Sequence, residues 1–195
     1  MSENLKNNSI NEEKNKWFHF DLSFFFMYCY TSVDKVITVS KSECNFLINN
    51  LGLDNKKVFY NNLALPEVYF NNGIPFQSEN IITYCGSWIS RKGIYPMVEA
   101  MKIILQKHKN YKFRIIGVGE NFEVLECFSD FLNQIEVIPF VEDKKELMNL
   151  YGQSSIFLFP SLSESFGLVV AEAMYCGCAL ISGPTGYAAE IINGQ

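Results

Sequence analysis

Short apolar runs alternate with longer segments of helical periodicity over most of the chain. The apolar runs, rich in β-branched and aromatic residues, predict strands at 34–40, 57–60, 81–85, 113–116, 135–138, 156–159 and 179–182. Apolar residues recurring every three or four positions predict helices at 11–30, 41–50, 93–107, 121–132, 144–151, 166–175 and 188–192. Because apolar strands alternate with helices, we expect an α/β fold with a parallel sheet covered on both faces.

One segment interrupts this alternation. Residues 63–80 are rich in Asn and Pro and show no period, which predicts a linker that we place at 71–79. We expect residues 1–70 to be the remainder of a first doubly wound domain, and residues 80–195 to form a second one. The first contains only two predicted strands and the second stops at a turn, so we expect an incomplete fold, open at both ends.

The composition excludes several classes of protein. With 48% apolar residues, 17 Phe and 10 Tyr, the chain can bury a full core and is not disordered. Its net charge of -5 disfavours a nucleic-acid partner. No apolar run approaches the roughly 20 residues that span a bilayer. The first 16 residues show no secretory signal. We therefore expect a cytoplasmic protein, either free or at a membrane surface.

Cysteine and histidine offer little chemistry. The six cysteines show no C-x-x-C spacing, so we expect reduced, mostly buried thiols. The two histidines, His19 and His108, lie in no metal-ligand spacing. The sequence therefore predicts neither a metal site nor a catalytic triad based on histidine.

In an open parallel sheet, ligands bind at the carboxyl ends of the strands, which directs attention to the loops there. The loop 86–93 has a glycine at each end and the adjacent cations Arg91 and Lys92 directly before a predicted helix. Two cations beside a helix N-terminus can hold a diphosphate without a metal. A solvated pair of surface cations is the alternative.

A second loop begins a dinucleotide fingerprint. Gly117-Val118-Gly119 supplies the first part of G-x-G-x-x-G, but Phe122 occupies the place of the third glycine. A tight turn from strand to helix is therefore a better interpretation than an NAD site. A phosphate could still approach this bare backbone.

The residues after the strand 156–159 carry the densest polar groups. Ser161, Ser163, Glu164 and Ser165 precede Gly167, which opens a helix whose first N–H groups are free for a ligand. Glu172 lies in that almost wholly apolar helix, which predicts a buried and partnered carboxylate. Such a loop can bracket a ribose or hexose joined to a diphosphate. A glycosidase pair, Glu164 with Glu172, is disfavoured because both come from one short segment.

These motifs together resemble a known family. The segment from Glu164 to Glu172 resembles the E-x7-E motif of the retaining GT-B glycosyltransferases of group 1, or family 4. Further matches in the same order are Val39-Ser40, Lys92-Gly93, Gly117-Val118-Gly119, Pro160-Ser161, Glu172-Ala173-Met174 with Gly177, and Gly186 with Glu190. One departure is Ser87, which occupies the usual place of an arginine, while Arg91 follows four residues later. The resemblance implies a Rossmann-like donor domain.

The resemblance also implies roles for individual residues. The catalytic groups would be Glu164, Lys92 and Arg91, with Lys92 on the diphosphate and Glu164 on donor sugar hydroxyls. Glu172 would accept from both ribose hydroxyls, and the backbone at Val141 would face the base. The remaining donor-binding residues would be Gly86, Ser87, Gly117, Gly119, Ser165, Phe166, Gly167 and Leu168.

The implied reaction transfers a hexose from a nucleoside-diphosphate sugar to a glycan or lipid-linked acceptor with retention of configuration. No cofactor or metal is expected, since cations would assist the leaving diphosphate. Peripheral membrane association, and a partner chain that completes the cleft, are both compatible with the sequence. The alternative is a non-catalytic module that binds a nucleotide sugar and needs a partner chain for catalysis.

Overall fold

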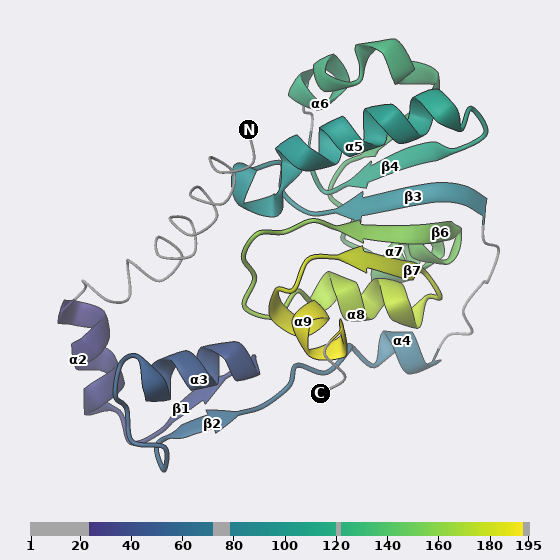
Figure 1. The fold of residues 1–195 in the computed structure, drawn as a ribbon. Helices are drawn as coiled ribbons and strands as arrows, with labels where there is room; N and C mark the ends of the chain where they lie inside the picture. Colours follow the sequence, from purple (N-terminus) through teal and green to yellow (C-terminus); the bar gives the residue numbers. More distant parts are fainter. Residues whose placement is uncertain (1–23, 72–78, 120–121, 193–195) are drawn as a thin grey trace. The chain divides into compact units, whose positions relative to one another are not determined.

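The computed structural model describes residues 24–71, 79–119 and 122–192. The chain divides into two compact units, Met1–Asn62 and Leu63–Gln195, and each is described by itself. In both units strands and helices alternate along the chain (Figure 1). The predicted α/β class is confirmed.

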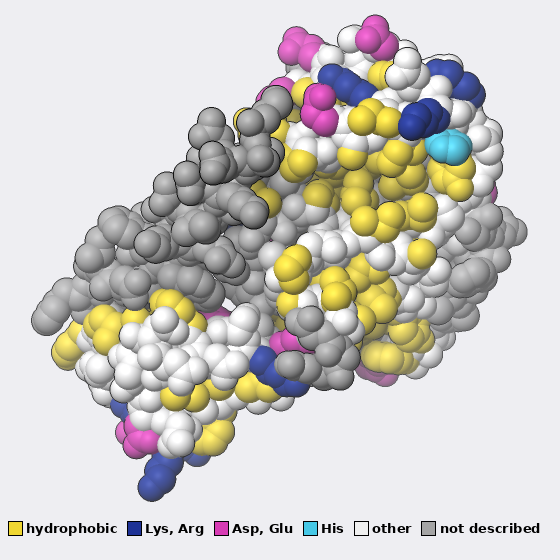
Figure 2. All heavy atoms as spheres, in the orientation of Figure 1, with side chains coloured by type: hydrophobic (Ala, Val, Ile, Leu, Met, Phe, Trp, Pro, Cys, Tyr) yellow, Lys and Arg dark blue, Asp and Glu magenta, His cyan; other side chains and the backbone are white. Residues whose placement is uncertain are grey.

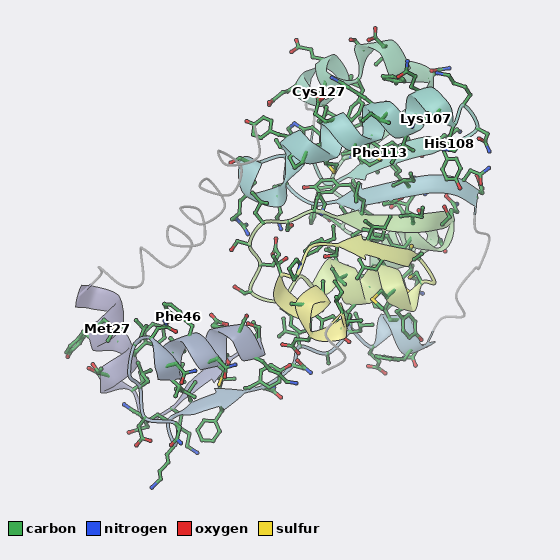
Figure 3. The ribbon with its side chains drawn as sticks, viewed as in Figure 1. Met27, Phe46, Lys107, His108, Phe113 and Cys127 are labelled. Carbon is green, nitrogen blue, oxygen red and sulfur yellow. The ribbon has the colours of Figure 1, made fainter. Side chains whose placement is uncertain are left out.

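The first unit contains a two-stranded parallel sheet. Its described elements are α2 (Phe24–Ser32), β1 (Val36–Thr38), α3 (Lys41–Asn49) and β2 (Val58–Tyr60). Ser40 caps α3, because its hydroxyl accepts a hydrogen bond from the N–H of Glu43. Leu47 from α3 packs with Leu53 and Val58, and Phe46, labelled in Figure 3, lies at the edge of this small core.

The second unit is built on a five-stranded parallel sheet with the order β5-β4-β3-β6-β7. The strands are β3 (Glu79–Cys85), β4 (Lys112–Ile116), β5 (Ile135–Ile138), β6 (Ser154–Phe159) and β7 (Ala179–Ser182). After β5 the chain crosses to the other side of β3, so the winding direction reverses between β3 and β6. The carboxyl ends of strands at such a reversal are the usual place for a ligand.

Helices cover both faces of this sheet (Figure 1). The elements are α4 (Val68–Asn71), the short η1 (Ser90–Lys92), α5 (Ile94–Lys107), α6 (Phe122–Cys127), η2 (Ser129–Gln134), α7 (Lys144–Gly152), α8 (Leu168–Tyr175) and α9 (Gly186–Ile192). On one face, Phe113 of β4 is fully buried with residues of α5 and α6 (Figure 3). On the other, Phe157 of β6 packs with α4, α7, α8 and α9. The predicted double covering is confirmed.

The predicted linker begins later than the boundary between the units. The second unit starts at Leu63, ahead of the predicted segment 71–79, and α4 forms where no periodicity was visible. Tyr69 of α4 is wholly buried in the core beside α7 and α8. A single buried aromatic is too short a signal for a periodicity argument, which explains the missed helix. Residues 72–78 lie outside the described residues.

Two other boundaries differ from the prediction. Of the predicted helix 11–30, residues 11–23 lie outside the described residues, and α2 extends to Ser32. The predicted helix 121–132 is broken, because α6 ends at Cys127 and η2 follows. Phe128 between them is fully buried against Phe113, at 5.6 Å between ring centroids, which fixes the chain at that break.

The surface shows mixed charge. On the face drawn in Figure 2, the Lys and Arg side chains of the described residues are scattered among Asp and Glu, and these residues form no broad basic patch there. Hydrophobic side chains also reach this surface, and the exposed residues of the second unit include Tyr95 and Ile103 of α5. No helix among the described residues is both long enough and apolar enough to cross a membrane.

Candidate functional site

The predicted site residues lie at the carboxyl ends of four parallel strands. Gly86 and Ser87 follow β3, Gly117 and Gly119 follow β4, and Val141 follows β5. The run from Glu164 to Gly167 lies between β6 and α8, and Leu168 is the first residue of α8. Gly86 donates its N–H to the carbonyl of Ile116 at 3.0 Å, so the loops after β3 and β4 leave the sheet side by side. All of these residues belong to the second unit.

The loops after β3 and β6 are held against each other by their backbones. Leu162 donates its N–H to the carbonyl of Arg91 at 2.9 Å. Gly93 adopts φ +71°, and a Cβ there would lie 2.1 Å from the carbonyl oxygen of Pro160. Only glycine allows both the left-handed backbone and this approach.

This packing brings the predicted cations onto Glu164. Both Lys92 and Arg91 form ion pairs with Oε1 of Glu164, Arg91 at 3.5 Å. Arg91 also donates to the carbonyl of Ser163 at 2.7 Å. The side chains of Lys92 and Glu164 are 16% and 11% exposed, whereas Arg91 is 51% exposed. Two cations share one carboxylate, so the cluster retains a positive charge that can attract an anion.

The segment leading into α8 is tightly packed. Gly167 has φ +81°, and a Cβ there would lie 2.8 Å from the ring of Phe159. Phe166 is buried and stacks on Tyr187, with 4.9 Å between ring centroids. Ser165 between Glu164 and Phe166 is exposed. Packing of Gly167 and Phe166 therefore fixes the backbone that enters α8, while Ser165 beside them remains exposed.

Glu172 is buried and partnered, as the apolar character of its helix predicted. Its side chain is 1% exposed, and its Oε1 accepts a hydrogen bond from Nζ of Lys144 at 2.8 Å. The two glutamates of the E-x7-E segment thus contact different cations, Glu164 those of η1 and Glu172 that of α7. A glycosidase pair would instead need two carboxylates on opposing walls of a cleft.

Several neutral groups surround the Glu172 carboxylate. Burial, and then the nearby charge of Glu172, raise the pKa of the Tyr69 hydroxyl. The pKa of Tyr151 is raised well above its usual value by burial first, with Cys85 and Glu172 adding to it. The same two causes, burial and Glu172, raise the pKa of Cys176 to about 11. These groups therefore remain protonated beside the carboxylate at neutral pH.

Sequence reasoning missed Lys144 and Tyr69. Lys144 is one of two adjacent lysines at the start of α7, and nothing in its local pattern distinguishes it from a solvated lysine. Tyr69 lies in the segment 63–80, which shows no period, and just before the predicted linker at 71–79. A lysine in the first turn of a helix is an unusual choice that could have served as a signal, because the helix dipole disfavours a cation there.

The dinucleotide interpretation gains no support from the geometry. Gly117 and Gly119 both have positive φ and form the turn after β4, which fits the structural interpretation of these glycines. Residues 120 and 121 lie outside the described residues, and α6 begins at Phe122. Among the described residues, no group of three or more His, Cys, Asp or Glu side chains could hold a metal ion.

Comparison with known proteins identifies relatives. The model of the family "Glycosyl transferases group 1" matches residues 67–194. An uncharacterized glycosyltransferase of Methanocaldococcus jannaschii is 30% identical over 171 residues, which cover 87% of this chain and 45% of that protein. The capsular polysaccharide biosynthesis glycosyltransferase CapM of Staphylococcus aureus is 30% identical over 118 residues, 59% of this chain and 31% of that protein. The chain spans less than half the length of the first curated relatives.

Solved structures share the fold. A glycosyltransferase from Rickettsia africae has a TM-score of 0.71 and 24% identity, over 88% of this chain and 51% of that one. A mutant of S. aureus TarM in complex with UDP has a TM-score of 0.72 and 16% identity, over 86% of this chain and 34% of that one. These likenesses assign the α/β fold to the GT-B type. Because the family model covers more than half of its residues, the chain belongs to the group 1 glycosyl transferases.

Proposed function

We propose that the second unit binds a nucleoside-diphosphate sugar, and that the protein transfers its hexose, with retention, to a glycan or lipid-linked acceptor. The observation that carries this proposal is the arrangement at one edge of the sheet. There, Arg91 and Lys92 share Glu164, while the buried Glu172 contacts Lys144. Cations suit a diphosphate, and carboxylates suit the hydroxyls of sugars.

Each group has a proposed role in this reaction. Lys92, with Arg91 further out, would neutralise the diphosphate as it leaves, so that no metal or other cofactor is required. Glu164 would accept from donor sugar hydroxyls and Glu172 from ribose hydroxyls. The amides of Phe166, Gly167 and Leu168 would hold phosphate and sugar, and the backbone at Val141 would face the base. The anomeric carbon exchanges its bond to the diphosphate for one to the acceptor oxygen, whose proton is released.

The acceptor class is inferred from the names of relatives. CapM is named for capsular polysaccharide biosynthesis, which favours a glycan as the acceptor. A lipid-linked acceptor, and a location in the cytoplasm or at a membrane surface, are part of the same proposal. We propose that the first unit belongs to an acceptor-side domain. A non-catalytic donor-binding module that needs a partner chain is the second candidate, because the proposed donor-binding residues all lie in the second unit.

Calorimetric titration of the purified chain tests the donor site. UDP, GDP, ADP and NAD are titrated separately without divalent metal, and we expect one nucleoside diphosphate to bind at micromolar concentration. Absence of binding by all three nucleoside diphosphates would overturn the proposal. Binding of NAD alone would favour a dinucleotide site. Donor hydrolysis or transfer, measured with the matching nucleotide sugar, then separates the enzyme from the module that needs a partner.

Two substitutions test the roles of the glutamates. Glu172→Ala should weaken binding of the nucleoside diphosphate about tenfold or more, because charge-assisted hydrogen bonds to ribose are lost. Glu164→Ala should leave that affinity unchanged and reduce turnover or the extra affinity conferred by the sugar. Equal nucleotide affinity in both variants and the parent would contradict this assignment.

A further inference from the structure

The ion pair between Lys144 and Glu172 is strongly asymmetric. The ammonium group lies 2.8 Å from Oε1 of the carboxylate, yet the Lys144 side chain is 42% exposed and that of Glu172 only 1%. Lys144 therefore reaches from the surface to a carboxylate that water hardly contacts. Removing the cation would leave a buried charge uncompensated, which is costly in a protein interior.

The position of Lys144 in its helix indicates that this contact matters. Lys144 is the first residue of α7, and Asp143 caps the helix by accepting from the N–H of Lys145. The positive end of the helix dipole disfavours a cation in this turn. The ion pair with Glu172 offsets this unfavourable interaction. Lys145 beside it is exposed and forms no ion pair with a described residue. The two lysines thus lie in the same helix turn, but of the two only Lys144 pairs with Glu172.

The other neighbours of Glu172 cannot replace the cation. The charge of Glu172 acts on four neighbours, and burial is the main cause of the raised pKa of each. They are Tyr69 of α4, Tyr151 of α7, Cys85 of β3 and Cys176, which follows α8. They are therefore neutral at physiological pH. The Tyr69 hydroxyl approaches the Glu172 carboxylate, and this side-chain contact adds to the rise in the pKa of Tyr69. A neutral hydroxyl supplies no counter-charge, and Lys144 is the cation that pairs with Glu172 among the described residues.

We propose that Lys144 is a positioning residue that holds the Glu172 carboxylate for ribose and thereby sets the preference of the site for ribonucleotides over 2′-deoxyribonucleotides. Lys144 occupies Oε1 and compensates the charge, while Oε2 accepts from a ribose hydroxyl. A carboxylate held at one oxygen presents the other in a defined direction, which a freely rotating group does not. This inference rests on the proposed nucleotide site.

The test compares two lysine variants of the full chain. Calorimetry measures the affinity for the nucleoside diphosphate that the parent binds, among UDP, GDP and ADP, and for its 2′-deoxy counterpart. For Lys144→Met we expect ribonucleotide affinity to fall about tenfold and deoxyribonucleotide affinity to fall less, so that their ratio shrinks. Lys145→Met removes the same charge from the same helix turn and should leave the ratio at its parental value.

Further variants separate positioning from damage to the fold. Lys144→Arg keeps a cation and should retain most of the preference for ribose, and in a Glu172→Gln background Lys144→Met should cause no further change in the ratio. An unchanged ratio in Lys144→Met, or an equal loss in Lys145→Met, overturns the role of Lys144 while nucleotide binding by the parent still stands. A parent that binds no nucleoside diphosphate overturns the proposed function and this inference together.

Discussion

At the scale of single residues, the carboxylates of the site are distinguished by their cations. Glu164 contacts two cations in a loop, while Glu172 contacts one from a neighbouring helix and is nearly excluded from water. Arg91, Lys92 and Glu164 could be predicted from sequence because they lie in loops after strands. Glu172 could be predicted because it lies in an apolar helix and completes the E-x7-E segment. The Lys144 contact could not be predicted, since it joins residues that are 28 positions apart through tertiary packing.

Lys92 and Arg91 should contribute unequally to binding. Lys92 is more deeply enclosed, with 16% of its side chain exposed against 51% for Arg91, and water screens exposed charges more effectively. We expect Lys92→Met to weaken nucleoside-diphosphate affinity about tenfold and Arg91→Met to weaken it by a smaller factor. Titration of both variants with the same nucleotide measures this difference. A larger loss in Arg91→Met would reverse the proposed order.

At the scale of elements, the sequence predicted the strands of the sheet and most helices, because period and composition agree there. It failed at α4, where one turn of helix is stabilised by the burial of Tyr69, and at the break between α6 and η2. In both places long-range packing of an aromatic ring decides the local structure. The sequence also could not show that the loops after β3 and β6 touch.

That contact makes Gly93 important for stability. A Cβ at Gly93 meets the backbone of Pro160, whereas Gly119 has nearly the same φ, +70°, and no non-neighbouring described atom within 4 Å of such a Cβ. In both Gly→Ala variants the alanine must adopt a strained left-handed backbone. Only Gly93→Ala also displaces the loop that contains Pro160. We expect Gly93→Ala to lose about 2 kcal/mol more in the free energy of unfolding. Urea denaturation measures the difference, and equal losses would show that the loops can separate freely.

At the scale of the whole molecule, all the proposed donor-binding residues belong to the unit Leu63–Gln195. This unit contains a five-stranded sheet with a core on each face. We therefore expect residues 63–195, expressed alone, to retain the nucleoside-diphosphate affinity of the full chain within about threefold, which calorimetry can measure. Loss of binding by a folded fragment would mean that the first unit contributes to the donor site.

The buried thiols predict the pH dependence of stability. Burial raises the pKa of Cys176 from 9.0 to about 11 and that of Cys178 to about 12. Between these pKa values the folded chain keeps the thiols neutral while the unfolded chain ionises them. Their contribution to the free energy of unfolding is therefore fully present below pH 9 and declines as the pH rises toward 11 to 12. Burial also raises the pKa of Tyr69, which lowers the free energy of unfolding in the same way at higher pH. Urea midpoints across this range, with Cys178→Ala as comparison, measure the decline; a flat profile would contradict it.

Cys176 also gives the molecule an internal reporter. The residue is 1% exposed and lies near Glu172, whereas Cys29, Cys44 and Cys127 are only partly buried. Alkylation requires an accessible thiolate, so the reaction of Cys176 with iodoacetamide counts the local openings of α8. A ligand that covers Glu172 would slow the labelling of Cys176 and leave the labelling of Cys29, Cys44 and Cys127 unchanged. Peptide mass spectrometry of the alkylated chain could therefore detect donor binding without a label on the donor.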